Sequence, residues 1–333
     1  MKNNFVRSAA VMGIIVVYIL LVFSIPCFAN EKTYVIKLGH SSPPNSIKQQ
    51  FAEKFAEEAE RLSNGKIEVK IFPSSQLGNI RDMIEGLRMG TVQVVIDPPS
   101  RLSVYTSKSK LADIFKMPFL FRDRNHGEKV WSSTEGKELL DRVADESEIM
   151  IIAMAWRGSR HLISTRPVYS PDDLKGLKIR VPPYDPPLTT WKVLGASPIP
   201  MDWGELFLGI QQGTVDALEN PLEVSYTSGF SEICKYITLT GHNKEFNGFM
   251  VGKKYFESLP SLIQLALKKA AQTAAKYGGD LVESLEGVYL QKYKDDGCEI
   301  IETDISKWEE KVEDWKYEYA PQITPIMKKF ESI

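Results

Sequence analysis

Apolar residues follow two different periods along the first hundred positions of the chain. Tyr34, Ile36 and Leu38 share one face of a two-residue alternation, which predicts a strand. From Ile47 to Leu62 apolar side chains return every three to four residues, which predicts an amphipathic helix. Strand-like and helix-like segments then alternate along the chain, and this alternation predicts an α/β fold. The expected elements are strands at residues 33–39, 67–71 and 91–96 and helices at residues 47–62 and 80–89.

The last of these units returns later in the chain. Residues 82–98 (DMIEGLRMGTVQVVIDP) align without gaps on residues 205–221 (ELFLGIQQGTVDALENP). We interpret this as two α/β lobes of similar plan; the alternative is chance recurrence of a common helix-Gly-strand pattern. Ligands of open α/β sheets bind at the carboxyl ends of the strands, so Asp97-Pro98 and Asn220-Pro221 are expected to face each other across a crevice.

Between the repeats, the chain has to pass from one lobe to the other. Residues 149–156 form a dense apolar run that predicts a strand buried on both faces. The charged residues 157–160 follow, and we expect a turn there at which the chain crosses. Residues 113–121 (DIFKMPFLF) are expected to be a buried linker or wall, and residues 131–143 a surface helix.

A long helical pattern begins near Pro260 and continues to about Tyr289, with Gly278-Gly279 as an expected bend. Such a helix can run from one lobe to the other. We therefore expect a first lobe from residues 30–157 plus about 246–285. The second lobe is expected to contain residues 158–245 plus 286–333.

The N-terminus has the pattern of a secretory signal. Lys2 and Arg7 precede an apolar run at residues 9–23, and small residues end at Ala29. We expect cleavage after Ala29, so that residues 1–29 are removed and the protein is exported. A retained anchor is the alternative, but the run is shorter than the roughly 20 residues that span a bilayer.

Composition limits the classes of partner. The 333 residues are 43% hydrophobic and 25% charged, which is typical of a globular protein long enough for two domains. The formal net charge is −2, and loss of Lys2 and Arg7 would make it more negative, which argues against nucleic-acid binding. Cys234 and Cys298 can either pair in an oxidising compartment or remain as two isolated buried thiols.

The sequence lacks the common catalytic signatures. It contains no G-x-S-x-G, H-E-x-x-H, C-x-x-C, P-loop or strand-linked G-x-G-x-x-G motif. The histidines show no metal-ligand spacing. We expect His126 to be a solvated loop residue, whereas His40 and His242 follow strand-like runs and can either line the crevice or serve as hydrogen-bonded structural residues.

Two arginines stand out as candidates for binding an anion. Arg160 lies near the expected crossover, and Arg180 ends the strand-like run 177–181. A guanidinium binds a carboxylate through two parallel hydrogen bonds, so both arginines can converge on one small organic acid. The alternative for Arg160 is a surface ion pair of little energetic weight.

Several segments together resemble the solute-binding proteins of TRAP (tripartite ATP-independent periplasmic) transporters, the DctP type. They are LKGLKIRVP followed by LGASPIPMDWGELFLGIQQGTVDALENP, with PSSQLG at residues 73–78 and SRHLIST at residues 159–165. The resemblance implies a two-lobed periplasmic solute-binding fold with a long helix spanning both lobes. It also implies a monomer that closes on a small organic acid and delivers it to a membrane permease, without catalysis or cofactor.

The same resemblance implies roles for individual residues. Arg180 matches the arginine that clamps the carboxylate, Arg160 a second arginine, and Asn220 the amide that completes the anion site. Trp203 replaces the usual Phe, and residues 97–99 read Asp-Pro-Pro where the sialic-acid branch has a glutamate, which puts sialic acid in doubt. The expected ligand-binding residues are Arg180, Arg160, Asn220, Trp203, Glu219, His242, Asp97, Arg101 and Ser41.

Three alternatives remain. A receptor of the same fold can present its ligand to a sensor kinase instead of a permease. An exported enzyme acting on a carboxylic acid can use Glu219, His242 or Asp97 as acid or base. A cation can bridge the ligand and the carboxylates of Asp97, Asp202 and Glu219. The sugar-acid and dicarboxylate classes of ligand are both open.

Overall fold

The computed structural model of the protein describes residues 33–333, so the expected signal segment lies outside the described residues. The strands are β1 (Tyr34–Gly39), β2 (Ile67–Phe72), β3 (Val94–Asp97), β4 (Ile149–Ser164), β5 (Lys178–Val181), β6 (Ser197–Pro200), β7 (Ala217–Pro221), β8 (Tyr236–Gly252) and β9 (Glu299–Ile301). The α-helices are α2 (Ile47–Leu62), α3 (Ile80–Met89), α4 (Arg124–Ser132), α5 (Thr134–Ser147), α6 (Pro187–Leu194), α7 (Leu206–Gln211), α8 (Leu222–Thr227), α9 (Lys253–Ser258), α10 (Ser261–Asp295), α11 (Ile305–Glu318) and α12 (Thr324–Glu331).

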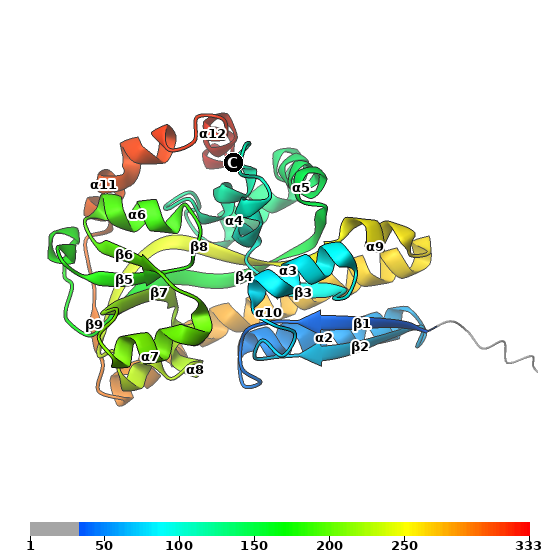
Figure 1. Cartoon of the computed structure of the whole chain (residues 1–333), viewed down its shortest axis with the longest axis horizontal. Helices are drawn as coiled ribbons and strands as arrows, with labels where there is room; N and C mark the ends of the chain where they lie inside the picture. The colour runs from blue at the N-terminus through cyan, green and yellow to red at the C-terminus, as the bar shows by residue number, and fades with distance from the viewer. Residues whose placement is uncertain (1–32) are drawn as a thin grey trace, which may run out of the picture. The chain divides into compact units, whose positions relative to one another are not determined.

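One mixed sheet carries all nine strands, in the order β2-β1-β3-β8-β4-β7-β5-β6, with β9 beside β8 (Figure 1). The long strands β4 and β8 pair antiparallel in its middle. The group β1, β2 and β3 with α2 and α3 is called the first lobe, and the group β5, β6 and β7 with α6, α7 and α8 the second lobe. This arrangement confirms the expected two-lobed α/β fold.

Capping residues explain where the first-lobe helices begin and end. Ser46 accepts a hydrogen bond from the backbone of Gln49 at the start of α2. Asn79 and Asp82 form a capping box at the start of α3, and Gly90 ends it with a left-handed φ of 74°. Both helices have the bounds expected from the sequence. The third strand begins later than expected, at Val94, because residues 91–92 complete the turn after α3.

The sequence repeat is also a structural repeat. Gly86 O accepts a 2.9 Å hydrogen bond from Thr91 N, and Gly209 O accepts one of the same length from Thr214 N. Each repeat leads into a strand that pairs parallel to a neighbour, β3 with β1 and β7 with β5. The side chains of the aligned residues Gln93 and Asp216 accept hydrogen bonds from the backbones of Lys37 and Lys178, at 2.9 and 3.0 Å. The two aligned segments therefore share the same local structure, from the end of the helix into the strand.

The expected turn at residues 157–160 is wrong, because these residues lie inside β4. The strand passes without interruption from the first lobe to the second, and its partner β8 returns alongside it. The pairing with β8 shifts register between Trp156 and Gly158, and Gly158 has a φ of +107°. A β-bulge therefore replaces the turn. The charged residues that suggested a turn point instead toward the cavity described below.

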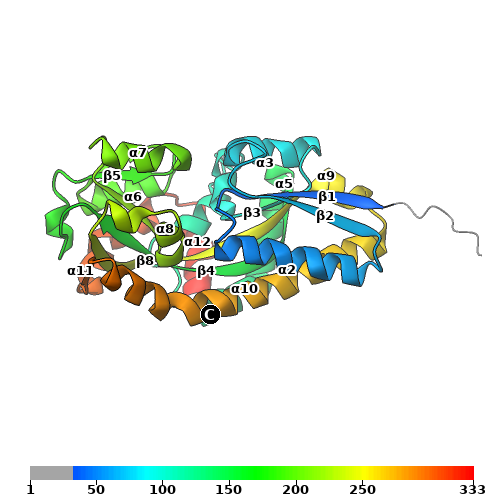
Figure 2. The same cartoon turned by 90° about the horizontal axis from the view of Figure 1, so that it is seen from below.

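The long helix α10 begins directly after Pro260, as expected, and packs against α2, β4 and α8, so that it touches both lobes (Figure 2). Gly278 and Gly279 lie within an uninterrupted helix. A Cβ atom on Gly278 would lie 2.1 Å from Cε1 of Phe51, so the absence of a side chain there allows α10 to approach α2 closely.

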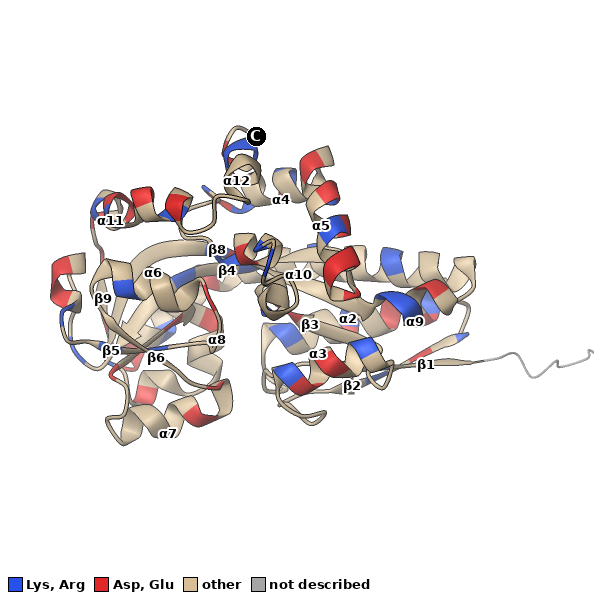
Figure 3. Ribbon diagram, turned by 45° about the horizontal axis from the view of Figure 1, so that its top comes forward, with Lys and Arg blue, Asp and Glu red and all other residues tan. Residues whose placement is uncertain are grey.

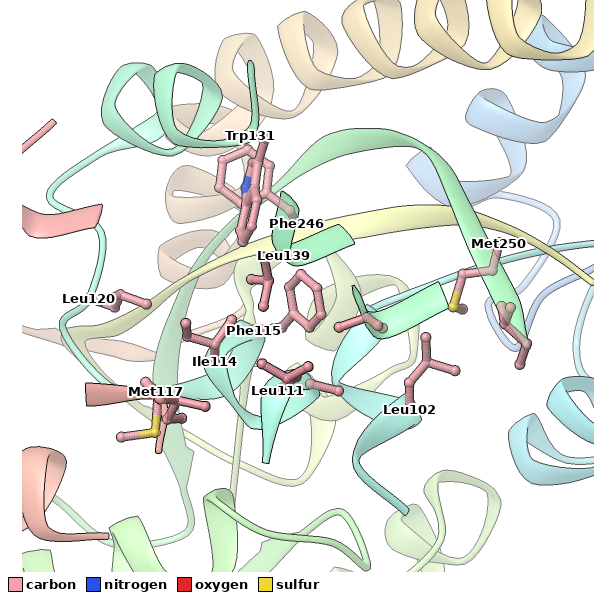
Figure 4. Close-up of a cluster of buried hydrophobic side chains, with 14 of the residues drawn as sticks. Leu102, Leu111, Ile114, Phe115, Met117, Leu120, Trp131, Leu139, Phe246 and Met250 are labelled. Atoms are coloured by element: carbon pink, nitrogen blue, oxygen red, sulfur yellow. The ribbon is translucent and has the colours of Figure 1, made fainter. Parts of the chain in front are cut away.

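Two corrections concern the region after residue 120. The expected surface helix at residues 131–143 is two helices, α4 and α5, which meet at Ser133, and Trp131 is buried in the large hydrophobic cluster of the first lobe (Figure 4). His126 is buried rather than solvated, because its Nε2 lies 2.9 Å from Phe330 O.

The C-terminus divides between the two cores. Trp308 of α11 packs with Trp191 in the second-lobe cluster. Phe330 of α12 instead lies 5.7 Å from Trp131 in the first-lobe cluster, measured between ring centroids. The expected assignment of residues 286–333 to the second lobe therefore does not hold for α12, whose apolar face completes the other core.

Cys234 and Cys298 are free and buried in the structure. They are neighbours, because Cys298 Sγ lies 3.6 Å from Cys234 O. In residues 33–333 none of the helices combines the length and the hydropathy needed to cross a membrane.

Candidate functional site

A cavity of ≈ 70 Å³ lies where the carboxyl ends of β3, β5 and β7 meet the central strands β4 and β8. Both lobes contribute to its wall, as expected for parallel strands that end at a common crevice. Seven of the nine expected binding residues line it. The lining residues are Ser41, Ser42, Ser75, Asn79, Ile80, Asp97, Arg101, Lys116, Arg157, Arg160, Arg180, Pro182, Pro183, Tyr184, Asp202, Trp203, Gly204, Asn220, Val224 and Glu245.

Arg180 is the one basic residue of the cavity wall that has no acidic partner within residues 33–333. Its side chain is buried, and its Nε donates to Met201 O at 2.8 Å. Its terminal nitrogens have no hydrogen-bond partner within residues 33–333, and its Cζ lies 5.6 Å from the centre of the Trp203 ring. Burial and the charge of Arg101 lower the pKa of Arg180 to about 9. The guanidinium is thus positioned by one bond and one ring, with its planar fork free for an acceptor.

Arg160, in contrast, is fully engaged. Its Nε and one terminal nitrogen donate to the carboxylate of Glu219, and it also donates to Glu219 O, to Asn220 Oδ1 at 2.8 Å and to Glu245 Oε2 at 2.6 Å. All five guanidinium N–H groups are therefore occupied. Arg160 lines the cavity together with Arg180, but only Arg180 retains free donors. The expected alternative of a surface ion pair is excluded, because Arg160 is only 4% exposed.

The bond from Arg160 fixes the orientation of the Asn220 amide. Because Oδ1 accepts from Arg160, the Nδ2 donor of Asn220 is directed away from that arginine. Asn220 and Arg180 lie on the parallel strands β7 and β5, both near the carboxyl end and both on the cavity wall. A guanidinium fork and an amide donor on neighbouring strand ends have the chemistry to hold a carboxylate.

Glu219 and His242 lie behind Arg160 and do not line the cavity. His242 Nε2 is 3.1 Å from Glu219 Oε2, and its Nδ1 is 2.8 Å from Thr240 Oγ1. Burial opposes ionisation of Glu219, but Arg160 and Lys116 outweigh it and lower its pKa well below the usual range. Burial lowers the pKa of His242. Glu219 is therefore a carboxylate that binds Arg160, and His242 is a neutral imidazole that holds Glu219 in place.

His40 also lies outside the cavity wall, buried and 2.9 Å from Gln49 Oε1 through its Nε2. Of the two roles left open for this histidine, the structure supports the structural one.

Asp97 orients two basic side chains on the first-lobe wall. Its two oxygens accept from Lys48 Nζ and Arg101 Nε, both at 2.7 Å. Burial disfavours the carboxylate, but Lys48, Arg101 and Arg157 outweigh it and lower the pKa of Asp97 to about 2. Asp97 is thus a constant negative charge at the end of β3, at the position aligned with Asn220. Ser41 lies on the same wall.

Three buried charged residues of the wall, Lys116, Arg157 and Glu245, were not identified as binding residues from the sequence. Glu245 on β8 accepts from Lys116 at 2.5 Å and from Arg157 and Arg160. Burial and the charge of Arg160 lower the pKa of Lys116 to about 8. Lys116 stands in the apolar run 113–121, and a lysine in a buried run almost always has a charged partner. That partner is 129 residues away in the chain, so only the fold reveals it.

Tyr184 was also missed. It follows Pro182 and Pro183 in the turn after β5, and its hydroxyl lies 3.0 Å from Ser100 Oγ. Its ring faces Arg101, with the guanidinium carbon 5.1 Å from the ring centre. The sequence did contain a signal, a single aromatic residue flanked by prolines beside the expected anion site.

The cavity wall has an excess of positive charge. Asp202 lies exposed at its rim, and basic and acidic positions are interspersed along the surface helices α3 and α5 (Figure 3). Within the described part of the chain, no group of three His, Cys, Asp or Glu side chains is arranged to hold a metal ion. The wall and its direct partners contain six basic residues, Lys48, Arg101, Lys116, Arg157, Arg160 and Arg180, and three buried acidic ones, Asp97, Glu219 and Glu245.

Comparison with known proteins identifies the family. The family model described as bacterial extracellular solute-binding protein, family 7, matches residues 38–322. The 2,3-diketo-L-gulonate-binding periplasmic protein YiaO of Escherichia coli (strain K12) is 30% identical over 295 residues, 88% of each chain. A TRAP periplasmic solute-binding protein of Roseobacter denitrificans with bound L-galactonate superposes with a TM-score of 0.84 at 29% identity, over 90% of this chain and 99% of that one.

A second solved structure, a TRAP periplasmic solute-binding protein of Polaromonas sp. JS666 bound to D-erythronate, has a TM-score of 0.84 at 28% identity, again over 90% of this chain and 99% of that one. The fold, the paired strand-end residues and the family match over nearly the whole described chain lead to one conclusion. The protein belongs to the DctP-type family of TRAP-transporter solute-binding proteins, whose members are ligand-binding transport receptors.

Proposed function

We propose that this receptor binds a small organic acid through a carboxylate held by Arg180 and Asn220, and that closure of the two lobes presents the acid to a TRAP permease. The observation that carries the proposal is the Arg180 fork, buried in the cavity without an acidic partner among the described residues. A buried charge without a partner is unfavourable. An anionic ligand supplies that partner.

The charge of the wall supports an acid over a neutral sugar. Six basic side chains face three buried acidic ones, so one carboxylate leaves further positive charge uncompensated. This favours either a dicarboxylate or a sugar acid whose hydroxyl groups accept hydrogen bonds from the remaining bases. The relatives solved with L-galactonate and D-erythronate are examples of the sugar-acid class.

The cavity size supports a compact ligand. A volume of ≈ 70 Å³ accommodates on the order of five water-sized groups. Trp203 lies beside the anion site, where its ring can pack against the ligand body. Together with Asp97 in place of a glutamate, this argues against sialic acid and for an acid of fewer carbons.

Closure would act through the central strands. β4 and β8 connect the lobes at the bulge beside Gly158, and α10 packs against both lobes. A ligand that contacts both walls binds the closed state better and therefore shifts the population toward it. We further propose that the protein is exported by a cleaved signal at residues 1–29 and acts as a periplasmic monomer, with the lobe boundaries expected from the sequence apart from α12.

A thermal-shift screen tests the proposal, because a tight ligand raises the melting temperature by mass action. D-Erythronate and meso-tartrate share a four-carbon chain and differ by one carboxylate, and erythritol is the matched neutral control. L-Galactonate and D-glucuronate extend the series. We expect a shift with at least one acid and none with erythritol. A uniform absence of shifts with all the acids, at millimolar concentration, would exclude the proposed ligand class.

A further inference from the structure

Tyr184 of the second lobe reaches across to the first lobe. Its hydroxyl lies 3.0 Å from Ser100 Oγ, and its ring lies 5.1 Å from Cζ of Arg101. Ser100 and Arg101 belong to the 3₁₀ helix η1 (Pro99–Val104), directly after β3, whereas Tyr184 follows β5. The contact therefore joins the two loops that extend the strand ends at the anion site.

Tyr184 and Arg101 separate two hollows in the protein surface. The inner one is the ligand cavity of ≈ 70 Å³. The outer one is a groove of ≈ 590 Å³ whose wall includes Ile84, Val104, Tyr105 and Pro200. Arg101 and Tyr184 line both hollows, together with Asn79, Ile80, Pro183 and Asp202. Side chains shared by two adjoining hollows form the partition between them.

The backbone around Tyr184 limits its freedom. Pro182 and Pro183 precede it, Pro186 and Pro187 follow it, and each proline fixes its own φ. Tyr184 N donates to Pro182 O at 2.8 Å, and Asp185 Oδ1 accepts from Thr189 Oγ1 at 2.8 Å. The ring is thus presented by a stiff loop, so its place in the partition depends mainly on the approach of the two lobes.

We propose that the Tyr184 ring, stacked on Arg101, is a gate that closes the ligand cavity toward the outer groove and limits the length of the acid that can bind. The inference rests on the proposed function, since it concerns the same cavity. Removal of the ring joins the cavity to the groove, so that an acid with an additional sugar unit can keep its carboxylate on Arg180 and extend outward. Arg101 holds the ring by a cation–π contact, which requires the ring but not the hydroxyl.

Selection by length provides the first test. The probes are D-galacturonate and its α-1,4-linked dimer, with L-galactonate and D-erythronate as further short acids, and binding is followed by calorimetry. Tyr184→Ala is expected to bind the dimer at least ~10-fold more tightly than the unsubstituted protein does and the short acids more weakly. Tyr184→Phe should keep the original discrimination, and Tyr277→Ala, at a tyrosine 44% exposed on α10, is the control. The gate is refuted if Tyr184→Ala rejects the dimer and binds the short acids unchanged.

A second measurement needs no bound acid. Val224 lines the inner cavity and is 8% exposed, so Val224→Cys places a thiol behind the gate. Its labelling by a small anionic methanethiosulfonate should be at least ~10-fold faster when combined with Tyr184→Ala, because entry follows opening of the partition. The protein without Val224→Cys gives the background from its own cysteines, and melting curves establish that the variants fold. Equal labelling rates would overturn the gate whatever binds, whereas faster labelling without any acid-induced shift would support the gate and contradict only the proposed function.

Discussion

The carboxylate of Glu223 accepts a 2.9 Å hydrogen bond from the backbone N–H of Ile47. Glu223 is in the first turn of α8, in the second lobe, and Ile47 begins α2, in the first lobe. The neighbours of both residues belong to the ligand site, because Val224 lines the cavity and Lys48 binds Asp97. The lobes are therefore joined at the helix that follows each strand end, in addition to the contact at Tyr184.

Removal of this bond should weaken ligand binding even though Glu223 does not line the cavity. A hydrogen bond to a charged group contributes about 1.5–3 kcal/mol, so Glu223→Ala is expected to lower affinity about 10-fold or more if the bond forms only on closure. Glu223→Gln keeps an oxygen acceptor and should bind nearly as well as the original protein. Calorimetry with the best acid of the screen measures both. Equal affinities of the Ala and Gln variants would show that the bond has no part in closure.

Binding of the acid should be sensitive to the shape of the Arg180 side chain as well as to its charge. Arg180→Lys retains a positive charge but not the planar fork, and we expect at least a ~10-fold loss of affinity for the acid. Arg61→Lys, at an exposed arginine of α2, is the matched control and should leave affinity unchanged. If calorimetry finds the same dissociation constant for both variants, the carboxylate is bound elsewhere.

Asn220→Asp tests the amide donor with almost no change in shape. The aspartate can still accept the hydrogen bond from Arg160, but it replaces the Nδ2 donor by a second negative oxygen facing the ligand carboxylate. Like charges at this distance repel, so affinity for the acid should fall by roughly 100-fold or more. An unchanged melting temperature together with lost binding would show that the substitution acts at the binding site and not on the fold. Retained binding would mean that the amide does not face the ligand.

The sequence predicted the parts of this protein that local patterns determine. The ends of α2 and α3 could be predicted because local residues cap them: Ser46 at the start of α2, and Asn79 and Gly90 at the two ends of α3. Arg180 and Asn220 could be placed at one crevice, because parallel strands end at the same edge. Their mutual distance still depended on the pairing of β5 with β7.

What escaped prediction depends on contacts between distant segments. Residues 157–160 resemble a turn because they are charged, but inside β4 their charges are satisfied by Glu219 and Glu245 from other strands. For the same reason the sequence could not reveal that the donors of Arg160 are all occupied. A charged stretch can be a buried strand where the neighbouring strands supply partners of opposite sign.

Two buried histidines should make stability depend on pH below neutrality. Burial lowers the pKa of His161 to about 3 and that of His40 to about 4. Between about pH 6.5 and 4 the unfolded chain therefore binds protons that the folded chain does not, and stability falls as the pH falls through this window. His161→Asn keeps an acceptor for Gly241 N and should reduce the slope by about 1.4 kcal/mol per pH unit. Urea unfolding at several pH values measures this slope, and an unchanged slope would mean that His161 is already protonated in the folded protein.

Lys116 should make ligand affinity depend on pH above neutrality. Its pKa is lowered to about 8 by burial and by Arg160, so the positive charge of the cavity decreases as the pH rises through that value. Affinity for an anion should then fall, by at most about tenfold per pH unit for a single proton. Lys116→Arg remains charged and should bind the acid without this step, whereas Lys116→Met should bind more weakly at pH 7 and likewise show no step. Calorimetry between about pH 7 and 8.5, below the pKa of about 9 of Arg180, distinguishes the three proteins. A step in this range that persists in Lys116→Arg would assign the titration to another group.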